Sequence, residues 1–321
     1  MSRKLITIST IMTLMSTSVI ADVPNVAADI APIHSLVSRV MDGVGAPKLI
    51  VQSGASPHGY RLRPSEAKAL QDADHVFWMG EELTPWLDSA IGTLASKASV
   101  TTLLDQQGVI LHDFREGALF EAHDHSAHGD DDHDDHKDHD DHDDHDDHDD
   151  HGSHDPHAWL SPENAKLWLN IIASKLSVSD PENAATYFMN AAAGQAEIEV
   201  MIAEVKATLK PVQGGKFVVF HDAYQYFEND FDFYASGAIS LGDSSDPSPA
   251  RIEKVQKRIR DEGIQCVLAE PQFKKGLVAT VMEGSDATAS VIDPLGAELE
   301  TGPKLYTRLI KNMAKTLRNC L

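Results

Sequence analysis

Basic residues are scarce in this chain of 321 residues, which has 27 Lys and Arg against 50 Asp and Glu and a formal net charge of -23. This acidic balance argues against nucleic acid and against anionic membrane surfaces as partners, because both are themselves negatively charged. It suits a protein that binds a cation. Residues 124–155 contain sixteen Asp and one Lys, so this segment supplies -15 and leaves only -8 for the rest of the chain.

A run of about 20 apolar residues, which a membrane-spanning helix requires, is also lacking. The apolar run near the start follows two basic residues and extends to Ile20, but several Ser and Thr interrupt it. A short run of this kind, ending in small or compact residues, is typical of an export signal, and a membrane anchor is the disfavoured alternative. We therefore expect residues 1–21 to be a signal peptide, cleaved near Ala21-Asp22, and the mature protein to lie outside the cytoplasm.

Cysteine is limited to Cys266 and Cys320. In an exported chain an even number of cysteines favours a disulfide. This bond would close a loop of roughly 55 residues and stabilise the fold by about 4 kcal/mol. The alternative is that both cysteines bind zinc, which an oxidising compartment disfavours because it removes the thiolates.

Short β-branched runs alternate with helical patterns along both halves of the chain. Strands are predicted at 48–54, 75–80, 216–223, 234–240, 264–270 and 290–296. Helices are predicted at 63–73 (capped by Ser65), 84–95, 249–262, 275–284 and 304–319. This alternation predicts an α/β fold with mainly parallel sheets and helices on both faces.

Residues 181–211 have a different composition, rich in Ala and Glu, with Pro181 able to begin a helix and Pro211 able to end it. Thirty helical residues would span about 45 Å, which is enough to brace two lobes. We therefore predict an N-terminal α/β lobe (22–180), one long linker helix (181–211) and a C-terminal α/β lobe (212–321).

The stretch DDHDDHDDHDDH (140–151) belongs to a tract rich in Asp and His, residues 123–154, which interrupts the first lobe. No apolar side chain lies between Ala127 and Ala158 except that of Pro156, so we expect a disordered loop. Its histidines are candidate accessory metal ligands: His123, His125, His128, His133, His136, His139, His142, His145, His148, His151 and His154. Zinc must displace protons there and order a flexible chain, so we expect weak, labile sites. A solvated spacer without a metal role is the alternative.

Six histidines lie outside the tract, and three of them share a setting. His58 follows one predicted strand, His221 closes another, and His157 precedes a helix. Ligands of open α/β sheets bind beyond the carboxyl ends of the strands, so we expect these three side chains to face one cleft between the lobes. The other histidines have apolar neighbours and are predicted to be structural: His34, His75 and His112.

Three neutral imidazoles suit Zn²⁺, whereas Mn²⁺ and Ca²⁺ prefer oxygen ligands. A fourth ligand is then needed. Asp293, which ends a predicted strand of the second lobe, is one candidate. A water molecule is the other.

Five segments carry a resemblance to a known family: GASPHGYRLRPSEAKAL, DPHAWLSPENA, VVFHDAYQYF, AEPQF and VIDPLGAEL. Together they resemble the zinc-binding periplasmic proteins of bacterial zinc ABC importers, the ZnuA-type members of the cluster A-I solute-binding family, over essentially the whole mature chain. The resemblance implies two α/β lobes bridged by a rigid helix, with the metal between them. It implies these metal ligands: His58, His157, His221 and Asp293.

Some details of the family pattern bear on the metal. Relatives that carry manganese have a glutamate at the position of His221, which favours zinc here. Some zinc members have a glutamate ligand immediately before the first histidine, where this chain has Pro57, so the fourth ligand stays open. A cysteine pair in the second lobe and a loop rich in His and Asp are further features of the zinc members.

The function that these features predict is that of a non-enzymatic periplasmic carrier, which captures Zn²⁺ and passes it to an inner-membrane ABC permease. We expect a monomer with no nucleic-acid partner, and periplasmic zinc chaperones are a further class of partner to consider. One alternative is a periplasmic zinc buffer acting mainly through the tract. The other is a zinc hydrolase or lyase, with a zinc-bound water and a carboxylate base drawn from Asp222, Glu270 or Asp293, although no substrate-binding motif accompanies them.

Overall fold

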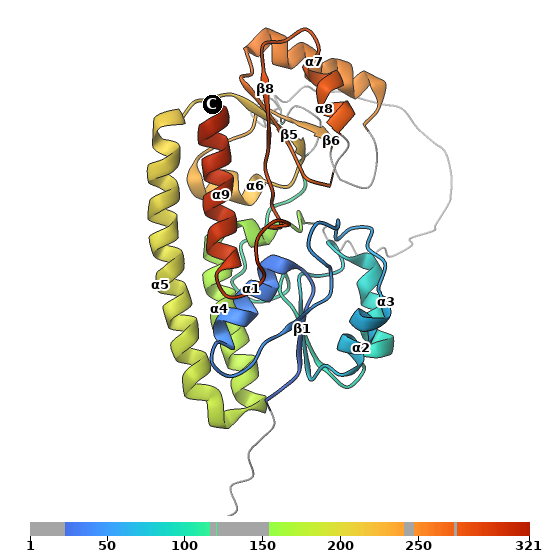
Figure 1. The fold of residues 1–321 in the computed structure, drawn as a ribbon, viewed down its shortest axis with the longest axis vertical. Coiled ribbons are helices and arrows are strands. Elements are labelled where there is room, and N and C mark those ends of the chain that lie inside the picture. The colour runs from blue at the N-terminus through green and yellow to red at the C-terminus, as the bar shows by residue number, and fades with distance from the viewer. Residues whose placement is uncertain (1–22, 116–119, 121–153, 241–246, 273–274) are drawn as a thin grey trace, which may run out of the picture.

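A computed structural model describes residues 23–115, 120, 154–240, 247–272 and 275–321 and arranges them as two α/β lobes, one above the other in Figure 1. The predicted signal peptide (1–21) lies outside the described residues. So do all the tract histidines except His154. Within the described parts of the chain, no helix is long and apolar enough to cross a membrane.

The N-terminal lobe contains a parallel sheet with the strand order β2-β1-β3-β4. Its strands are β1 (Val26–Ala28), β2 (Lys48–Leu49), β3 (His75–Trp78) and β4 (Ser99–Thr102). Its helices are α1 (Ala31–Val40), α2 (Pro64–Gln71), α3 (Pro85–Leu94) and α4 (Pro162–Ser179). The sequence patterns did not predict β1, α1 or β4. The predicted cap at Ser65 is wrong, because α2 begins at Pro64 and the Glu66 carboxylate accepts the Arg63 backbone N–H at 2.7 Å.

The C-terminal lobe repeats this plan, with four parallel strands in the order β6-β5-β7-β8. Its strands are β5 (Phe217–His221), β6 (Ala238–Ser240), β7 (Cys266–Ala269) and β8 (Thr288–Val291). Its helices are α6 (Gln225–Phe231), α7 (Pro249–Glu262), α8 (Lys275–Met282) and α9 (Leu305–Cys320). The strand predicted at 290–296 ends at Val291, and the chain then turns around Asp293. The prediction of an α/β fold with parallel sheets is confirmed.

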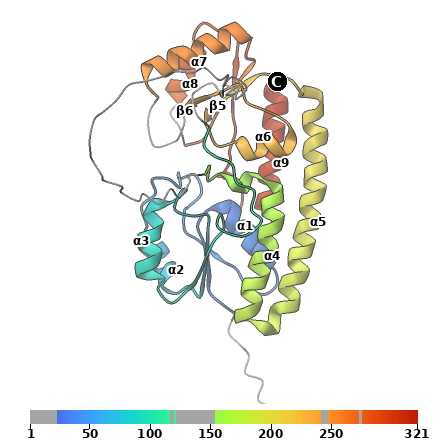
Figure 2. The same cartoon turned by 180° about the vertical axis from the view of Figure 1, so that it is seen from behind.

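The linker helix is present as α5 (Ala184–Leu209), with a 3-10 turn at each end (Pro181–Asn183 and Lys210–Val212). It runs along one side of the molecule, and α9 lies beside it (Figures 1 and 2). Helix α9 also packs against α1 of the first lobe. The predicted linker helix is thus present, and α9 of the second lobe packs across the boundary beside it.

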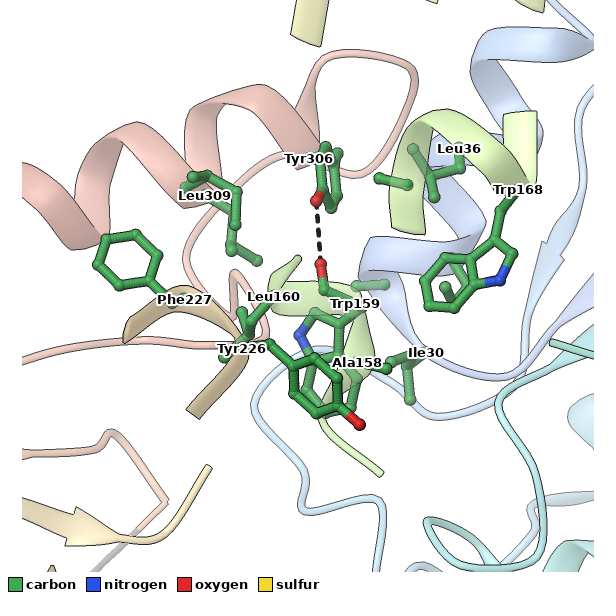
Figure 3. Packing of buried hydrophobic residues seen from close by; sticks show 14 of the residues in the cluster. Ile30, Leu36, Ala158, Trp159, Leu160, Trp168, Tyr226, Phe227, Tyr306 and Leu309 are labelled. Carbon is green, nitrogen blue, oxygen red and sulfur yellow. Dashed lines mark hydrogen bonds between the residues drawn. The ribbon is translucent and has the colours of Figure 1, made fainter. Parts of the chain in front are cut away.

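One continuous apolar core connects the two lobes. Figure 3 shows Trp159 of the first lobe close to Tyr306 of α9, whose hydroxyl donates to the Trp159 carbonyl at 3.0 Å. The Trp159 indole N–H in turn donates to the carbonyl of Pro294 at 2.8 Å. A wide separation of the lobes would expose this core to water, so the packing favours a fixed spacing between them.

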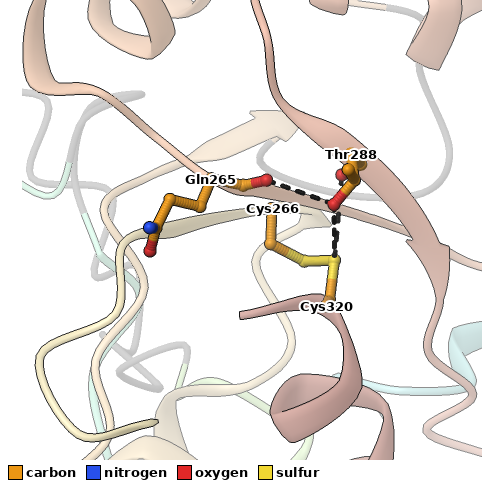
Figure 4. The surroundings of a disulfide bond; sticks show 4 residues. All are labelled: Gln265, Cys266, Thr288 and Cys320. Carbon is orange, nitrogen blue, oxygen red and sulfur yellow. Dashed lines mark hydrogen bonds between the residues drawn. A yellow bond between two sulfur atoms is a disulfide. The ribbon is translucent and has the colours of Figure 1, made fainter.

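Cys266, at the start of β7, and Cys320, at the end of α9, form the predicted disulfide (Figure 4). The bond removes the alternative in which these cysteines bind zinc.

Because the disulfide closes a separation of 54 residues, we expect its reduction to destabilise the protein by about 4 kcal/mol. The candidate metal histidines lie on other segments, so zinc stoichiometry should be retained. Denaturant unfolding with and without reductant, paired with metal analysis, measures both effects. An unchanged midpoint after complete reduction would contradict the expectation.

Asp29, at the end of β1, is fully buried, and its carboxylate accepts the backbone N–H groups of Ile30 and Met79, each at 2.7 Å. Burial raises the pKa of this carboxyl from 3.8 to about 7, although the hydrogen bonds oppose the rise. Between these pH values the folded state holds a proton that the unfolded state has released. Folding stability must therefore fall as the pH rises from about 4 to about 7.

The variant Asp29→Asn should lack this part of the pH dependence. Urea unfolding of both proteins at about pH 5 and about pH 8 gives a double difference in which other titrating groups cancel. Relative to the variant, the wild type should lose up to about 1.4 kcal/mol per pH unit inside the window. Equal losses in the two proteins would show that Asp29 titrates normally.

Candidate metal centre

Three histidines from separate segments meet between the lobes. One ring nitrogen from each of His58, His157 and His221 lies within 4.8 Å of the others, and they are the only group of this kind among the described residues. His157 and His221 are buried, and His58 is half-buried. The three residues that the sequence singled out for a metal therefore do come together.

His221 is the last residue of β5, in the middle of the second sheet, and His157 lies just before a 3-10 turn (Ala158–Leu160) that leads into α4. The side chain of Ser161 caps α4 by accepting the Asn164 backbone N–H. Regular structure thus fixes the backbone on one side of each histidine: strand β5 before His221, and the 3-10 turn after His157.

His58 lies in the loop between β2 and α2, and two contacts hold that loop. The indole N–H of Trp86 in α3 donates to the carbonyl of Pro57 at 2.7 Å, directly beside the histidine. On its other side, the Tyr60 hydroxyl donates to the Glu66 carboxylate in α2 at 2.7 Å. The loop is therefore anchored to α2 and α3 of its own lobe.

Carboxylates orient the two buried imidazoles. Nδ1 of His157 is 2.6 Å from Asp155 Oδ1, and Nδ1 of His221 is 2.5 Å from Glu270 Oε1. Asp155 also accepts the His157 backbone N–H at 3.0 Å, and the Gln272 side chain donates to the second oxygen of Glu270 at 2.7 Å. A carboxylate that accepts from Nδ1 is a common partner of a metal-binding histidine, because it fixes the ring and its tautomer.

The spacing of the two Nε2 atoms indicates what lies between them. Carboxylates only accept hydrogen bonds, so Nδ1 is assigned the proton in each neutral ring and Nε2 keeps a lone pair. The Nε2 atoms of His157 and His221 are 3.4 Å apart. Two lone pairs this close repel each other unless a cation lies between them. Tetrahedral zinc with Zn–N distances of about 2.0–2.1 Å places two ligand nitrogens roughly 3.3 Å apart. The observed separation of 3.4 Å is therefore close to that of two nitrogen ligands of one tetrahedral zinc ion.

Asp293 lies outside the group of three histidines. Its Oδ1 accepts the backbone N–H groups of Leu295 and Gly296 at 3.0 and 2.8 Å, and its Oδ2 accepts that of Ala297 at 2.6 Å. Burial raises the pKa of this carboxyl, while the three hydrogen bonds oppose the rise. In this arrangement the carboxylate holds the turn after β8 together.

The histidines predicted to be structural have partners elsewhere. His34 in α1 bonds to the Pro47 carbonyl at 3.1 Å, and His75 in β3 to the Ser179 hydroxyl at 2.7 Å. His112 bonds to the Asn229 side chain at 3.3 Å. His154, the one described histidine of the tract, pairs with the Asp113 carboxylate at 3.0 Å. None of them belongs to the group of three.

The sequence reasoning missed Asp155 entirely and considered Glu270 only as a base. The position of each carboxylate relative to its histidine offers a signal. Asp155 lies two residues before His157, and Glu270 follows β7, the strand next to that of His221. A search for carboxylates two residues from each histidine and at the end of the neighbouring strand would have found them.

Comparison with known proteins gives the family. Residues 26–320 match the family described as zinc-uptake complex component A, periplasmic. A high-affinity zinc uptake system protein ZnuA from Brucella abortus (strain 2308) is 47% identical over 304 residues, which cover 92% of this chain and 91% of that protein. A protein of the same name from Paracoccus denitrificans (strain Pd 1222) is 43% identical over 302 residues, with coverages of 94% and 93%.

Solved structures share the fold. A crystal structure of ZnuA has a TM-score of 0.72 at 21% identity, and covers 93% of this chain and 99% of that one. A mutant structure of the laminin-binding adhesin Lmb from Streptococcus agalactiae has a TM-score of 0.72 at 20% identity, with coverages of 93% and 99%. The two lobes, the long helix and the match over residues 26–320 lead to one conclusion: this chain belongs to the family of periplasmic zinc-uptake complex component A.

Proposed function

We propose that this protein captures Zn²⁺ in the periplasm, in the site formed by His58, His157 and His221, and delivers it to an ABC permease in the inner membrane. The observation that carries this proposal is the 3.4 Å separation of the His157 and His221 Nε2 atoms, with each Nδ1 held by a carboxylate. The zinc-uptake names of the relatives agree with it.

Zinc is the cargo that this site fits best. Three imidazole nitrogens and no carboxylate form the group, and this donor set disfavours Mn²⁺ and Ca²⁺. A water molecule is the favoured fourth ligand, because both Asp293 oxygens already accept backbone N–H groups. Asp293 remains the alternative, since each oxygen has a second lone pair.

Hydrolysis is disfavoured by the bonding of the candidate bases. Asp222 pairs with Arg115, Glu270 with His221 and Gln272, and Asp293 with backbone N–H groups. A general base needs a carboxylate that can reach the proton it removes. A binding protein needs only the metal ligands and their supports, which are present.

The proposed transport function also defines where the protein acts and with which partners. We propose that the chain is exported and that residues 1–21 are cleaved off. The lobes 22–180 and 212–321 then flank the helix 181–211, and the protein acts as a monomer. The permease is the required partner. Zinc chaperones of the periplasm are a further partner class, and ions bound by the tract would supply the cleft.

The proposal is tested by zinc-limited growth. A strain lacking the gene should stop growing in chelator-treated medium, and should recover on added zinc or on expression of the wild-type protein. The purified protein should bind one Zn²⁺ tightly and prefer it to Mn²⁺. Normal growth of the deletion strain under zinc limitation, or tighter binding of Mn²⁺, would refute the proposal.

A further inference from the structure

A second buried charge cluster lies beside the metal site. Nε of Arg115 donates to both oxygens of Asp222 at 3.0 and 3.1 Å, and its Nη1 and Nη2 donate to Glu228 at 2.7 and 3.2 Å. The side chains of Asp222 and Glu228 are only 6% and 1% exposed, and that of Arg115 is 17% exposed. One guanidinium thus pairs with two buried carboxylates.

The surroundings of Arg115 make this a fixed arrangement. The planar guanidinium can bind a carboxylate with two parallel N–H groups, which an ammonium group cannot do. The ring of Phe120 lies 3.6 Å from the guanidinium carbon and covers its face. Breaking a buried pair leaves an uncompensated charge, which is strongly unfavourable.

The ion pairs join the two lobes at the metal site. Arg115 follows β4 of the first lobe, whereas Asp222 directly follows His221, and Glu228 lies in α6 of the second lobe. Helix α6 meets the first lobe at other points as well. The Tyr226 hydroxyl accepts the His112 backbone N–H at 3.1 Å and donates to the Asp155 carbonyl at 2.7 Å.

We propose that Arg115 is a positioning residue of the metal site, which holds His221 of the second lobe at ligand distance from His157 of the first. The proposal rests on the proposed zinc-binding function. His157 and His221 belong to different lobes, so their Nε2 separation depends on how the lobes are held together. Ligands held in place before the metal arrives lose little entropy when it binds, and a shift of about 1 Å between them weakens the site.

Two possible roles of Arg115, through its charge or through positioning His221, predict opposite changes in zinc affinity when the side chain is removed. A guanidinium has no acceptor atom and cannot bind a metal. If it acted only through its positive charge, its removal would strengthen the binding of a nearby Zn²⁺. If it positions His221, its removal weakens binding.

The test compares Arg115→Met, which removes the charge and the donors, with Arg115→Lys, which keeps the charge but not the fork. Arg39→Met is the matched control. Arg39 also binds a carboxylate with two N–H groups (Glu197, both at 3.1 Å) and is 13% exposed, but it joins α1 to α5. Zinc affinity is measured by competition with a chromophoric chelator, the release rate by stopped-flow mixing with excess chelator, and stability by denaturant unfolding without metal.

We expect Arg115→Met to lower zinc affinity about 10- to 100-fold, the range seen when a supporting partner of a metal ligand is lost, mainly through faster release. Arg115→Lys should fall between it and the wild type. Arg39→Met should lose stability and keep its zinc affinity within about twofold of the wild type, because it supports no ligand. Wild-type or tighter binding by folded Arg115→Met would overturn the proposal.

A second variant covers failure to fold. If Arg115→Met does not fold, the triple variant R115M/D222N/E228Q removes the uncompensated charges and also the link between the lobes. It should still bind zinc more weakly, and wild-type affinity in this variant would overturn the proposal. Absence of tight binding by the wild type would overturn the proposed function too, whereas tight wild-type binding with no effect at Arg115 would overturn this inference alone.

Discussion

Replacing His58, His157 or His221 with alanine, one at a time, should weaken zinc binding by more than about 100-fold while the fold persists. Loss of an outer partner alone typically lowers metal affinity about 10- to 100-fold, and a direct ligand contributes more. Replacing His157 also removes the Nδ1–H donor of the buried Asp155 carboxylate, and replacing His221 removes that of the buried Glu270 carboxylate. Some loss of stability should therefore accompany these two, but not His58→Ala.

The measurement is competition against a chelator of known zinc affinity, with circular dichroism to confirm the fold. His75→Ala is the matched control, because His75 bonds to Ser179 within the first lobe and lies outside the group of three. Its zinc affinity should stay close to that of the wild type. Wild-type affinity in all three single variants of the site would show that the assignment is wrong.

Deleting residues 123–153 should reduce the zinc bound at saturation to about one ion per chain and leave the tightest affinity nearly unchanged. The deletion spares His154 and Asp155, because His154 pairs with Asp113 and Asp155 orients His157. The composition of the deleted segment predicts that ions bound there must first order the chain, whereas the three histidines of the site are already held.

Isothermal titration of both forms, with a zinc competitor for the tight site, measures stoichiometry and affinity together. Uptake by cells carrying the deletion should suffer mainly when zinc is scarce, because the tract is expected to gather ions beside the cleft. An alternative outcome is loss of tight binding while His58, His157 and His221 remain. The tract itself would then be the main site, as in the zinc-buffer alternative.

Much of the fold was determined locally. The alternation of strand and helix patterns predicted the α/β plan. The position of α5 was predicted from a composition rich in Ala and Glu between two prolines, and both signals lie within short segments. The disulfide was predicted from an even cysteine count in a chain that we expect to be exported. His58 and His221 were predicted as metal ligands because they lie at strand ends, beyond which ligands of open α/β sheets bind. His157 was predicted from its place before a helix.

Only the tertiary structure decided how those residues act together. The 3.4 Å approach of two Nε2 atoms, the carboxylates behind them and the use of both Asp293 oxygens in a turn depend on side-chain directions that no periodicity encodes. The contacts that hold the lobes together, such as Trp159 with Pro294 and Arg115 with Asp222, join residues more than 100 positions apart. Such contacts form only when distant segments pack, so the chain's order alone does not show them. The sequence determined which ligands are available, and packing between the lobes determined where they meet.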